Sequence, residues 1–306
     1  MQLLLGLPAP AKLNLFLHIT GRRADGYHLL QSVFVPVALS DTLDVELRRD
    51  GRITRSGDVI GAPEQDLVVR AARLLQQASG TTFGAALHLT KRIPAGSGLG
   101  GGSSDAATTL TALNRLWQLH WPRAQLAALA LQLGADVPFF LGPGPALVEG
   151  IGEHVTGVSH ELADRPLWAV IVHPQVHVST AEIFAAPGLT RSTKPVTIRA
   201  LSEVLKPSAP EQHGVDDVLF GRNDLQPEVV RRTPAVNDAL NALASHTSRT
   251  PRMSGSGSAV FVLTDAESDA QRMVAAMQVR PEFSSWAVRC LAEHPLSAWL
   301  SETHSA

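Results

Sequence analysis

The chain of 306 residues contains very little cysteine and very little excess charge. Cys290 is its single cysteine, so no internal disulfide can form, and such usage is typical of a reducing compartment. The formal net charge is −2. With so little charge of one sign, the chain lacks the electrostatic surface that nucleic acids or anionic lipids bind. We therefore expect no nucleic-acid partner.

Long apolar runs and targeting signals are also missing. The first ten residues carry no positive charge ahead of their apolar part, unlike a signal peptide. The most apolar later stretch, 126–148, is interrupted by Gln132, Asp136 and three prolines, which excludes a membrane span. We expect a cytoplasmic protein with no membrane partner.

Several common enzyme motifs are absent. No segment reads as a Walker A motif, as the H-R-D and D-F-G pair of protein kinases, or as G-x-S-x-G. His160 begins like H-E-x-x-H, but the second histidine is missing. Gly96, Gly98 and Gly101 match G-x-G-x-x-G, yet the acidic residue expected about 20 positions later is absent. These absences argue against a metalloprotease, an α/β-hydrolase and a dinucleotide fold.

The composition is that of a folded globular protein with more than one core. Apolar residues make up 44% of the chain and charged residues 18%, which is far from the composition of disordered chains. At this length, single cores usually stop growing. We expect two domains, or one large domain with a satellite.

Periodicity predicts a mixture of strands and helices. Alternation over Ala11–Ile19, a turn over Gly21–Gly26 and a second strand over Tyr27–Val37 indicate an N-terminal hairpin. Further expected strands are Thr42–Arg48, Ala85–Arg92, Leu167–Val172, Ala259–Leu263 and Trp286–Leu291. Expected helices are Asp66–Ala78, Ser103–Leu119, Arg123–Leu133, most of Glu228–Ala244, and Glu267–Met277. The stretch Pro187–Pro210 reads as an exposed excursion.

A loop rich in glycine and serine, Pro94–Ala107, lies between a predicted strand and a predicted helix. Glycines there let an oxyanion approach the main chain closely. The free N–H groups and the dipole at the start of the following helix favour a negative ligand. The loop therefore predicts a polyphosphate site, and the chain a nucleotide-binding enzyme.

Taken with three further blocks, this loop resembles the phosphate loop of the superfamily of galactokinase, homoserine kinase, mevalonate kinase and phosphomevalonate kinase. The N-terminal block, Pro10–Leu15 followed by 21–28, is similar to the branch whose substrate carries a cytidine diphosphate group. The other two blocks are Leu133–Phe139 and Met253–Ala259. The resemblance spans roughly Pro8 to Phe261.

The resemblance implies an α+β, two-lobed small-molecule kinase fold. Residues 1–155 would form an N-terminal ATP-binding lobe like domain 2 of ribosomal protein S5, and residues 156–306 a C-terminal α+β substrate lobe. The implied reaction transfers a phosphate from ATP, with Mg²⁺, to a hydroxyl of a small cytidine diphosphate compound. Another kinase of the superfamily, of the homoserine or mevalonate type, is the alternative. The oligomeric state, monomer or homodimer, is left open.

The resemblance also assigns roles to residues. Lys12 and Asp136 would be catalytic, and their joint presence argues against a non-catalytic nucleotide-binding regulator. Substrate contacts would come from Asn14, Tyr27, His28, Thr180 and Phe184, with Tyr27 and Phe184 stacking on the base. ATP would contact Lys91, Pro94, Ala95, Gly96, Ser97, Gly98, Leu99, Gly100, Gly101, Gly102, Ser103 and Ser104.

Two acidic residues and the metal ligands are not fixed by the motifs. The superfamily branch commonly has asparagine where this chain has Asp66, which weakens the case for an adenine contact there. Asp105 is expected in the first turn of its helix, where dipole complementarity explains a carboxylate. No motif names a metal ligand, and Ser104 with solvent is the natural candidate.

Overall fold

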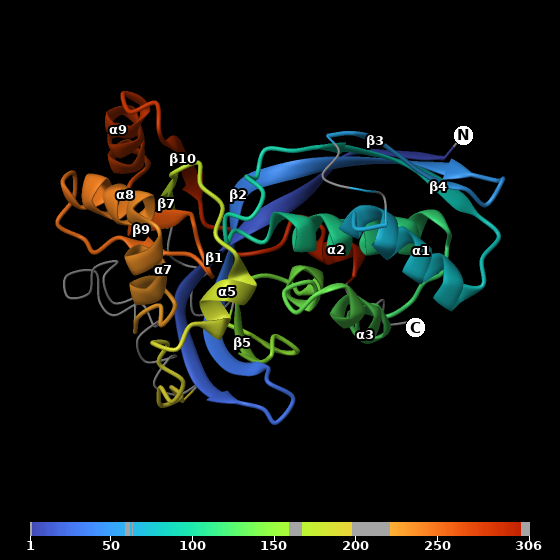
Figure 1. Cartoon of the computed structure of the whole chain (residues 1–306). Helices are drawn as coiled ribbons and strands as arrows, with labels where there is room; N and C mark the ends of the chain where they lie inside the picture. Colours follow the sequence, from blue (N-terminus) through green and yellow to red (C-terminus); the bar gives the residue numbers. More distant parts are fainter. Residues whose placement is uncertain (1, 59–61, 63, 159–166, 198–220, 301–306) are drawn as a thin grey trace.

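The computed structural model describes residues 2–58, 62, 64–158, 167–197 and 221–300, and in this part of the chain it contains two sheets (Figure 1). The first sheet has six strands in the order β3-β4-β2-β5-β6, with β1 paired to β2. The second has four, in the order β10-β7-β9-β8. The mixed sheets and helices confirm the predicted α+β class.

Two long antiparallel strands, β1 (Leu3–Arg22) and β2 (His28–Arg48), belong to the first sheet, and residues of both pack against the second (Figure 1). The N-terminal hairpin is confirmed. The prediction of separate strands at Tyr27–Val37 and Thr42–Arg48 was wrong, because β2 continues through both. Its backbone stays paired with β1 up to Glu46, with register shifts that let the strands bend.

Four short strands complete the first sheet: β3 (Ile53–Gly57), β4 (Gly84–Thr90), β5 (Ala146–Gly150) and β6 (His154–Gly157). Strands β3 and β4 pair in parallel, and helix α1 connects them. Sequence periodicity predicted β4 but did not identify β3, β5 or β6.

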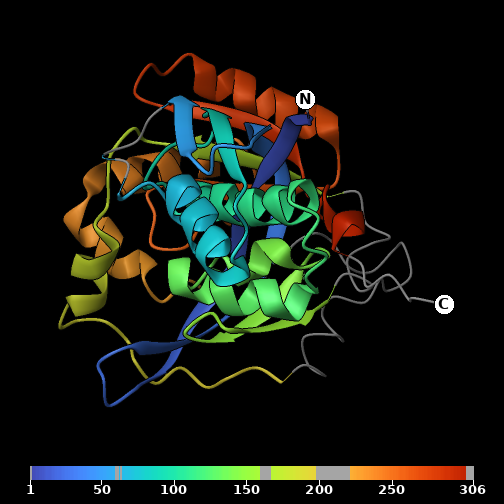
Figure 2. The same cartoon turned by 90° about the vertical axis from the view of Figure 1, so that its right-hand side faces the viewer.

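Helices α1 (Leu67–Ser79), α2 (Gly101–Leu116) and α3 (Arg123–Leu133) cover one face of the first sheet, as Figure 2 shows. The carboxylate of Asp66 caps α1 by accepting from the N–H groups of Val68 and Val69, and Gly80 ends the helix in a left-handed conformation. A short 3₁₀ helix, η1 (Pro138–Leu141), follows α3. The predicted bounds of α1 and α3 are confirmed within one residue.

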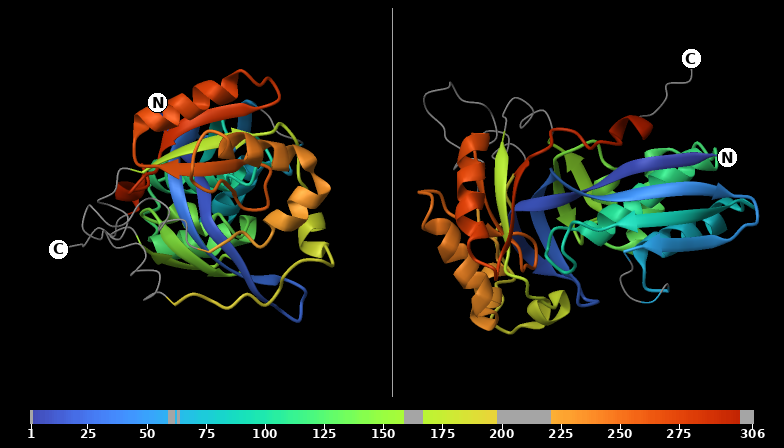
Figure 3. Two further views of the ribbon diagram at one scale, coloured as in Figure 1. Left: turned by 90° about the vertical axis from the view of Figure 1, so that its left-hand side faces the viewer. Right: turned by 90° about the horizontal axis from the view of Figure 1, so that it is seen from above.

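The second sheet consists of β7 (Trp168–His173), β8 (Arg252–Met253), β9 (Val260–Thr264) and β10 (Ser284–Arg289), all antiparallel. Helices α7 (Gln226–Arg232), α8 (Pro234–Ala244) and α9 (Glu267–Gln278) pack on its side away from the first sheet (Figure 3). The helical pattern expected over Glu228–Ala244, apart from Pro234, is divided at that proline: α7 ends at Arg232 and α8 starts at Pro234.

Side chains that alternate along β7 and β9 pack one face of the second sheet against β1 and β2 and the other face against helices α7, α8 and α9. Ile171 and Phe261 belong to a buried cluster with residues of β1 and β2. Val172 and Val262 belong to another, with residues of α7, α8 and α9. Because successive strand residues point to opposite faces, this sheet is buried on both sides. The first of these two clusters joins the sheets into one packed body.

The proposed division of the chain, between residues 155 and 156, falls within β6 (His154–Gly157), the last strand of the first sheet along the chain, and not between the sheets. The first sheet ends with β6 at Gly157 and the second starts at Trp168. After β10 the chain returns, through the 3₁₀ helix η3 (Ser297–Trp299), and Leu296 and Leu300 pack in the core of the first sheet. Residues 187–197 of the predicted excursion form neither helix nor strand, and the rest of it lies outside the described residues. Nowhere in the described ranges is a helix both long and apolar enough to cross a bilayer.

Phe261 tests the packing between the two sheets. Truncation to alanine removes a fully buried ring from the cluster that joins them. We expect Phe261→Ala to lower the free energy of unfolding by about 3–5 kcal/mol, measured by denaturant titration. The control is Val279→Ala, at a side chain 78% exposed after α9, which should stay within about 0.5 kcal/mol of the parent. Equal effects of the two substitutions would contradict this packing.

Candidate active site

A cleft of about 930 Å³ lies where the two sheets meet, and residues from both halves of the chain line it. It contains nearly all of the side chains that the sequence singled out. They are Lys12, Asn14, Tyr27, His28, Lys91, Pro94–Gly98, Gly100–Ser103, Asp136, Thr180 and Phe184. Residues 255–257 of the second glycine/serine loop close the cleft from the C-terminal side.

The glycine loop is held at this place by main-chain contacts with both halves of the chain. The N–H of Lys12 donates to the carbonyl of Leu99, and the N–H of Ala259 donates to the carbonyl of Ser97, each at 2.9 Å. Between them, Gly98 has φ +78°, and a Cβ atom there would lie 2.2 Å from the carbonyl oxygen of Ser254. A side chain at Gly98 is therefore excluded for two reasons: the positive φ angle disfavours any other residue, and the main chain of Ser254 occupies the space that a Cβ atom would need.

Two of the predicted ATP contacts do not line the cleft. The side chain of Leu99 is fully buried in the core, so only its main chain can take part in the loop. Ser104 is also fully buried, and its hydroxyl has no hydrogen-bond partner in the described part of the chain. The hydroxyl oxygen of Ser104 is therefore a buried acceptor with no donor among the described residues, close in sequence to the glycines of the loop.

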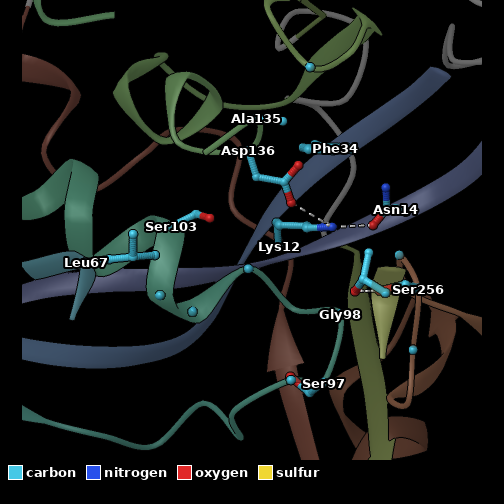
Figure 4. A pocket seen from close by; sticks show the side chains of 18 of the residues that line it. Lys12, Asn14, Phe34, Leu67, Ser97, Gly98, Ser103, Ala135, Asp136 and Ser256 are labelled. Carbon is cyan, nitrogen blue, oxygen red and sulfur yellow. Dashed lines mark hydrogen bonds and ion pairs between the residues drawn. The ribbon is translucent and has the colours of Figure 1, made fainter. Parts of the chain in front are cut away.

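Lys12 and Asp136 face each other across the cleft, as Figure 4 shows. The Nζ atom of Lys12, on β1, is 3.4 Å from Oδ2 of Asp136, in the turn between α3 and η1. Lys12 also donates to Oδ1 of Asn14 at 2.5 Å, and its ammonium lies 4.5 Å from the centre of the Phe34 ring. Asp136 caps no helix, since η1 has no side-chain cap.

Burial and charge act in opposite directions on Lys12. Its side chain is 3% exposed, and this burial lowers the pKa of the ammonium, which the nearby carboxylate of Asp136 partly restores. Asn14 is held in turn by donating from Nδ2 to the hydroxyl of Ser32 at 2.9 Å. The side chain of Lys12 is thus held in place by Asn14, and the nearby carboxylate of Asp136 favours its charged form.

Lys91, predicted to contact ATP, lines the cleft but already has carboxylate partners. Its ammonium contacts the carboxyl groups of both Asp41 and Asp105, so it is already held in an ion-pair cluster. Burial alone would lower the pKa of Lys91, but the two carboxylates outweigh it and raise the pKa. Lys91 lines the cleft, yet its charge is neutralised before any phosphate arrives.

The expectation for Asp105 was wrong in position. Helix α2 begins at Gly101, so Asp105 is its fifth residue and lies outside the first turn. Burial raises its pKa to about 7, with Lys91 opposing and Asp41 adding to the shift. The helix dipole therefore does not explain this carboxylate; the contact with Lys91 does.

Asp41 was missed by sequence reasoning and fixes the start of the glycine loop. Its Oδ1 atom accepts from the N–H groups of Arg92, at 2.5 Å, and Ile93, at 2.8 Å, directly before the loop. Asn223, also missed, donates to the carbonyls of Met253 and Gly255 at 2.8 Å each and so holds the second glycine/serine loop. Neither residue lies in a motif, and each acts on main-chain groups distant in sequence.

The other end of the cleft carries the aromatic residues. Tyr27 is 63% exposed, and the rings of His28 and Phe184 lie with centroids 5.1 Å apart at 31°. Thr180 is within hydrogen-bond distance of Ser256, with the two hydroxyl oxygens 2.7 Å apart. Asp66, which also lines the cleft, forms an ion pair with Arg55 besides capping α1. Its carboxylate is thus already committed to two partners.

Comparison with known proteins gives the family. The description "GHMP kinases N terminal domain" matches residues 66–144, and "GHMP kinases C terminal" matches residues 208–280. A 4-diphosphocytidyl-2-C-methyl-D-erythritol kinase of Methylibium petroleiphilum is 49% identical over 98% of this chain and 99% of its own length. One of Burkholderia orbicola is 50% identical over 96% of each. The chain belongs to this family of GHMP kinases.

Solved structures agree with this membership. A crystal structure of 4-(cytidine 5'-diphospho)-2C-methyl-D-erythritol kinase superposes with a TM-score of 0.70 at 32% identity, covering 94% of this chain and 99% of its own. A homoserine kinase from Cytophaga hutchinsonii superposes at 0.67 with 18% identity, covering 96% of both chains, and shows the shared fold alone. The kinase is an ATP-using enzyme of this family.

Asp41 and Asp105 should differ in their effect on stability. The folded-state pKa of Asp105 is raised to about 7, so its ionisation destabilises the fold as pH rises from about 4 toward 7. Asp105→Asn removes this penalty and leaves Lys91 paired with Asp41. We expect the free energy of unfolding of the variant to be at least that of the parent at pH 8. Below pH 4 the two values should agree, because Asp105 is then protonated in both the folded and the unfolded state.

Asp41→Asn is the matched comparison in the same cluster. It replaces the fully buried carboxylate that binds both Lys91 and the start of the glycine loop. We expect a loss of about 3–5 kcal/mol at pH 8, because one partner of a buried pair is removed. Denaturant titrations at pH 4, 6 and 8 measure both variants. Equal losses from both substitutions would contradict the distinct roles of the two carboxylates.

Proposed function

We propose that the kinase transfers the γ-phosphate of ATP to the 2-hydroxyl of 4-diphosphocytidyl-2-C-methyl-D-erythritol, in the non-mevalonate route to isoprenoid precursors. The observation that carries the proposal is one continuous cleft with three parts. A glycine loop lies on one side, Lys12 and Asp136 face each other on another, and Tyr27, His28 and Phe184 lie at the far end. The names of the curated relatives support the same substrate.

The glycine loop would bind the triphosphate chiefly through main-chain N–H groups. Lys91 is neutralised by two carboxylates, so it adds little net charge there. The N-terminus of α2 begins within the loop, at Gly101, and supplies N–H groups and the positive end of the helix dipole. A loop that binds phosphates through main-chain N–H groups, with little net positive charge around it, can release ADP after the transfer.

Lys12 and Asp136 would act on the hydroxyl that attacks the γ-phosphorus. A new P–O bond forms to the substrate oxygen, the bond to the β-phosphate oxygen breaks, and ADP leaves. The proton of the hydroxyl passes to the carboxylate of Asp136. Because the transition state is loose, orienting the hydroxyl matters more than removing its proton early. The buried ammonium of Lys12 offsets charge on the transferring group.

Mg²⁺ is proposed as the partner of ATP. The described residues contain no group of three or more His, Cys, Asp or Glu side chains able to hold a metal. Magnesium commonly binds to nucleotides through the phosphates and few protein ligands, so the proposal places the ion chiefly on the phosphates and solvent. When bound, the ion would neutralise charge on the phosphates.

An assay of ADP release with different alcohols tests the proposal. The substrates are the cytidyl compound, mevalonate and homoserine, each offered with ATP and Mg²⁺. We expect turnover with the cytidyl compound alone. Equal or faster turnover of mevalonate or homoserine would contradict the assignment.

Asp136→Asn and Lys12→Met test the catalytic pair. Each keeps the size of the side chain and removes the charge that acts in the transition state. We expect kcat to fall by about 100-fold or more in each case, with KM for both substrates changed by less than about threefold. Asp269→Asn is the control, an exposed carboxylate on α9, and should leave kcat unchanged. An Asp136→Asn enzyme with the kcat of the parent would exclude Asp136 as the proton acceptor.

A further inference from the structure

His28 lies at the far end of the cleft, with its ring beside that of Phe184. It is the first residue of β2, it follows Tyr27, and its ring lies against Phe184. One of its two ring nitrogens already has a partner. The Nε atom of Arg191 lies 3.1 Å from Nε2 of His28. In the described part of the chain, Nδ1 makes no hydrogen bond.

Arg191 can only donate, since a guanidinium has no acceptor. Nε2 of His28 must therefore accept, and a neutral imidazole that accepts at Nε2 carries its hydrogen on Nδ1. Protonating the ring would place an N–H group against the N–H of Arg191. The contact thus selects one tautomer and disfavours the charged form.

We infer that Arg191 is a positioning residue for the cytosine base: it holds His28 neutral and in the tautomer that offers Nδ1–H to an acceptor on the base. This inference rests on the proposed function. Cytosine presents acceptors at N3 and O2, whereas uracil presents an N–H at N3. A ring that donates at Nδ1 therefore favours cytosine wherever it meets N3.

Arg191 is itself held firmly. Its guanidinium also donates to three carbonyls at or after the end of α5 (Thr180–Ala185), from NH2 to Ala186 at 2.6 Å and to Phe184 at 3.4 Å, and from NH1 to Leu189 at 3.2 Å. These bonds connect the helix that carries Phe184 with the strand that carries His28. Arg191 therefore holds both His28 and the helix that carries Phe184.

The segment that follows Arg191 is anchored to the hairpin of β1 and β2. The N–H of Thr193 donates to the carbonyl of Ile19 at 2.9 Å, and its hydroxyl donates to Asp224 at 2.6 Å. The N–H of Val196 donates to the side chain of Gln31 at 2.7 Å. Arg191 cannot easily move away from His28 while these bonds persist.

The charges around His28 act in the same direction as the hydrogen bond. Burial lowers the pKa of His28, and the positive charges of Arg191 and Arg22 lower it further. The nearby carboxylate of Asp25 pairs with Arg23, 2.9 Å away. His28 is therefore neutral at pH 7, and binding that needs neutral His28 is lost as pH falls through this lowered pKa. Without Arg191 the pKa rises, and the loss begins at a higher pH.

Kinetics of Arg191→Gln from pH 5.5 to 8 provide the main test. We expect KM for the cytidyl substrate to rise about tenfold at pH 7, as one fixed hydrogen bond is lost, with kcat and KM for ATP changed by less than about twofold. The acid limb of kcat/KM should move to higher pH. Arg272→Gln, at an exposed arginine on α9, is the control and should change none of these.

A double-mutant cycle separates a role through His28 from a direct or structural one. In a His28→Ala background, Arg191→Gln should raise KM clearly less than in the parent, because the ring it positions is gone and only its bonds to the carbonyls at the end of α5 remain to be lost. Arg191→Lys, which keeps a cation but loses the fixed geometry, should recover part of the low pKa and little of the affinity. An unchanged KM and acid limb, or an equal KM rise in both backgrounds, would overturn the inference.

Measurements on the parent enzyme keep the test independent of folding and of turnover. Nitrogen NMR of His28 at pH 7 should show hydrogen on Nδ1 and none on Nε2, and CDP should bind more tightly than UDP. Hydrogen on Nε2, or equal binding of the two nucleotides, would overturn the inference. A parent enzyme that phosphorylates mevalonate or homoserine and not the cytidyl compound would instead overturn the proposed function, and the two failures can be told apart.

Discussion

The site depends on one main-chain junction. The glycine loop meets β1 through the bond from Lys12 N–H to the Leu99 carbonyl, and meets the residue before β9 through the bond from Ala259 N–H to the Ser97 carbonyl. Gly98 lies between them with no space for a side chain. Three segments distant in sequence are thereby fixed to one another. Because the main chain of Lys12 is part of the junction, the junction also fixes where the proposed catalytic lysine lies relative to the loop.

Charge is distributed around this junction so that few free cations face the cleft. Lys91 is neutralised by Asp41 and Asp105, whereas Lys12 has Asp136, which is 34% exposed, as its carboxylate partner. Burial lowers the pKa of Lys12, the carboxylate of Asp136 opposes that shift, and Asn14 and the face of Phe34 also contact the ammonium. The main-chain N–H groups of the loop remain as the principal anion ligands. The arrangement favours transfer of a phosphate over permanent binding of one.

Local chemistry made part of the fold predictable from sequence. Asp66 and Gly80 bound α1, and Pro122 and Gly134 bound α3, because caps and breakers act within a few residues. The joining of two predicted strands into β2 depends instead on pairing with β1 along most of their length, which periodicity cannot reveal. The same limit applies to the site. The motifs predict Lys12, Asp136 and the glycine loop as site residues, because each lies in a recognisable local pattern. Asp41 and Arg191 act through contacts across 50 and 163 positions of sequence, and no local pattern signals them.

The most direct test of the central claim is a crystal structure with a non-hydrolysable ATP analogue and the cytidyl substrate bound together. The account predicts phosphate oxygens on the main-chain N–H groups of residues 96–102, and the 2-hydroxyl within hydrogen-bond distance of Asp136, between that carboxylate and the γ-phosphorus. Phosphates bound away from the glycine loop, or an acceptor hydroxyl that does not reach Asp136, would contradict it.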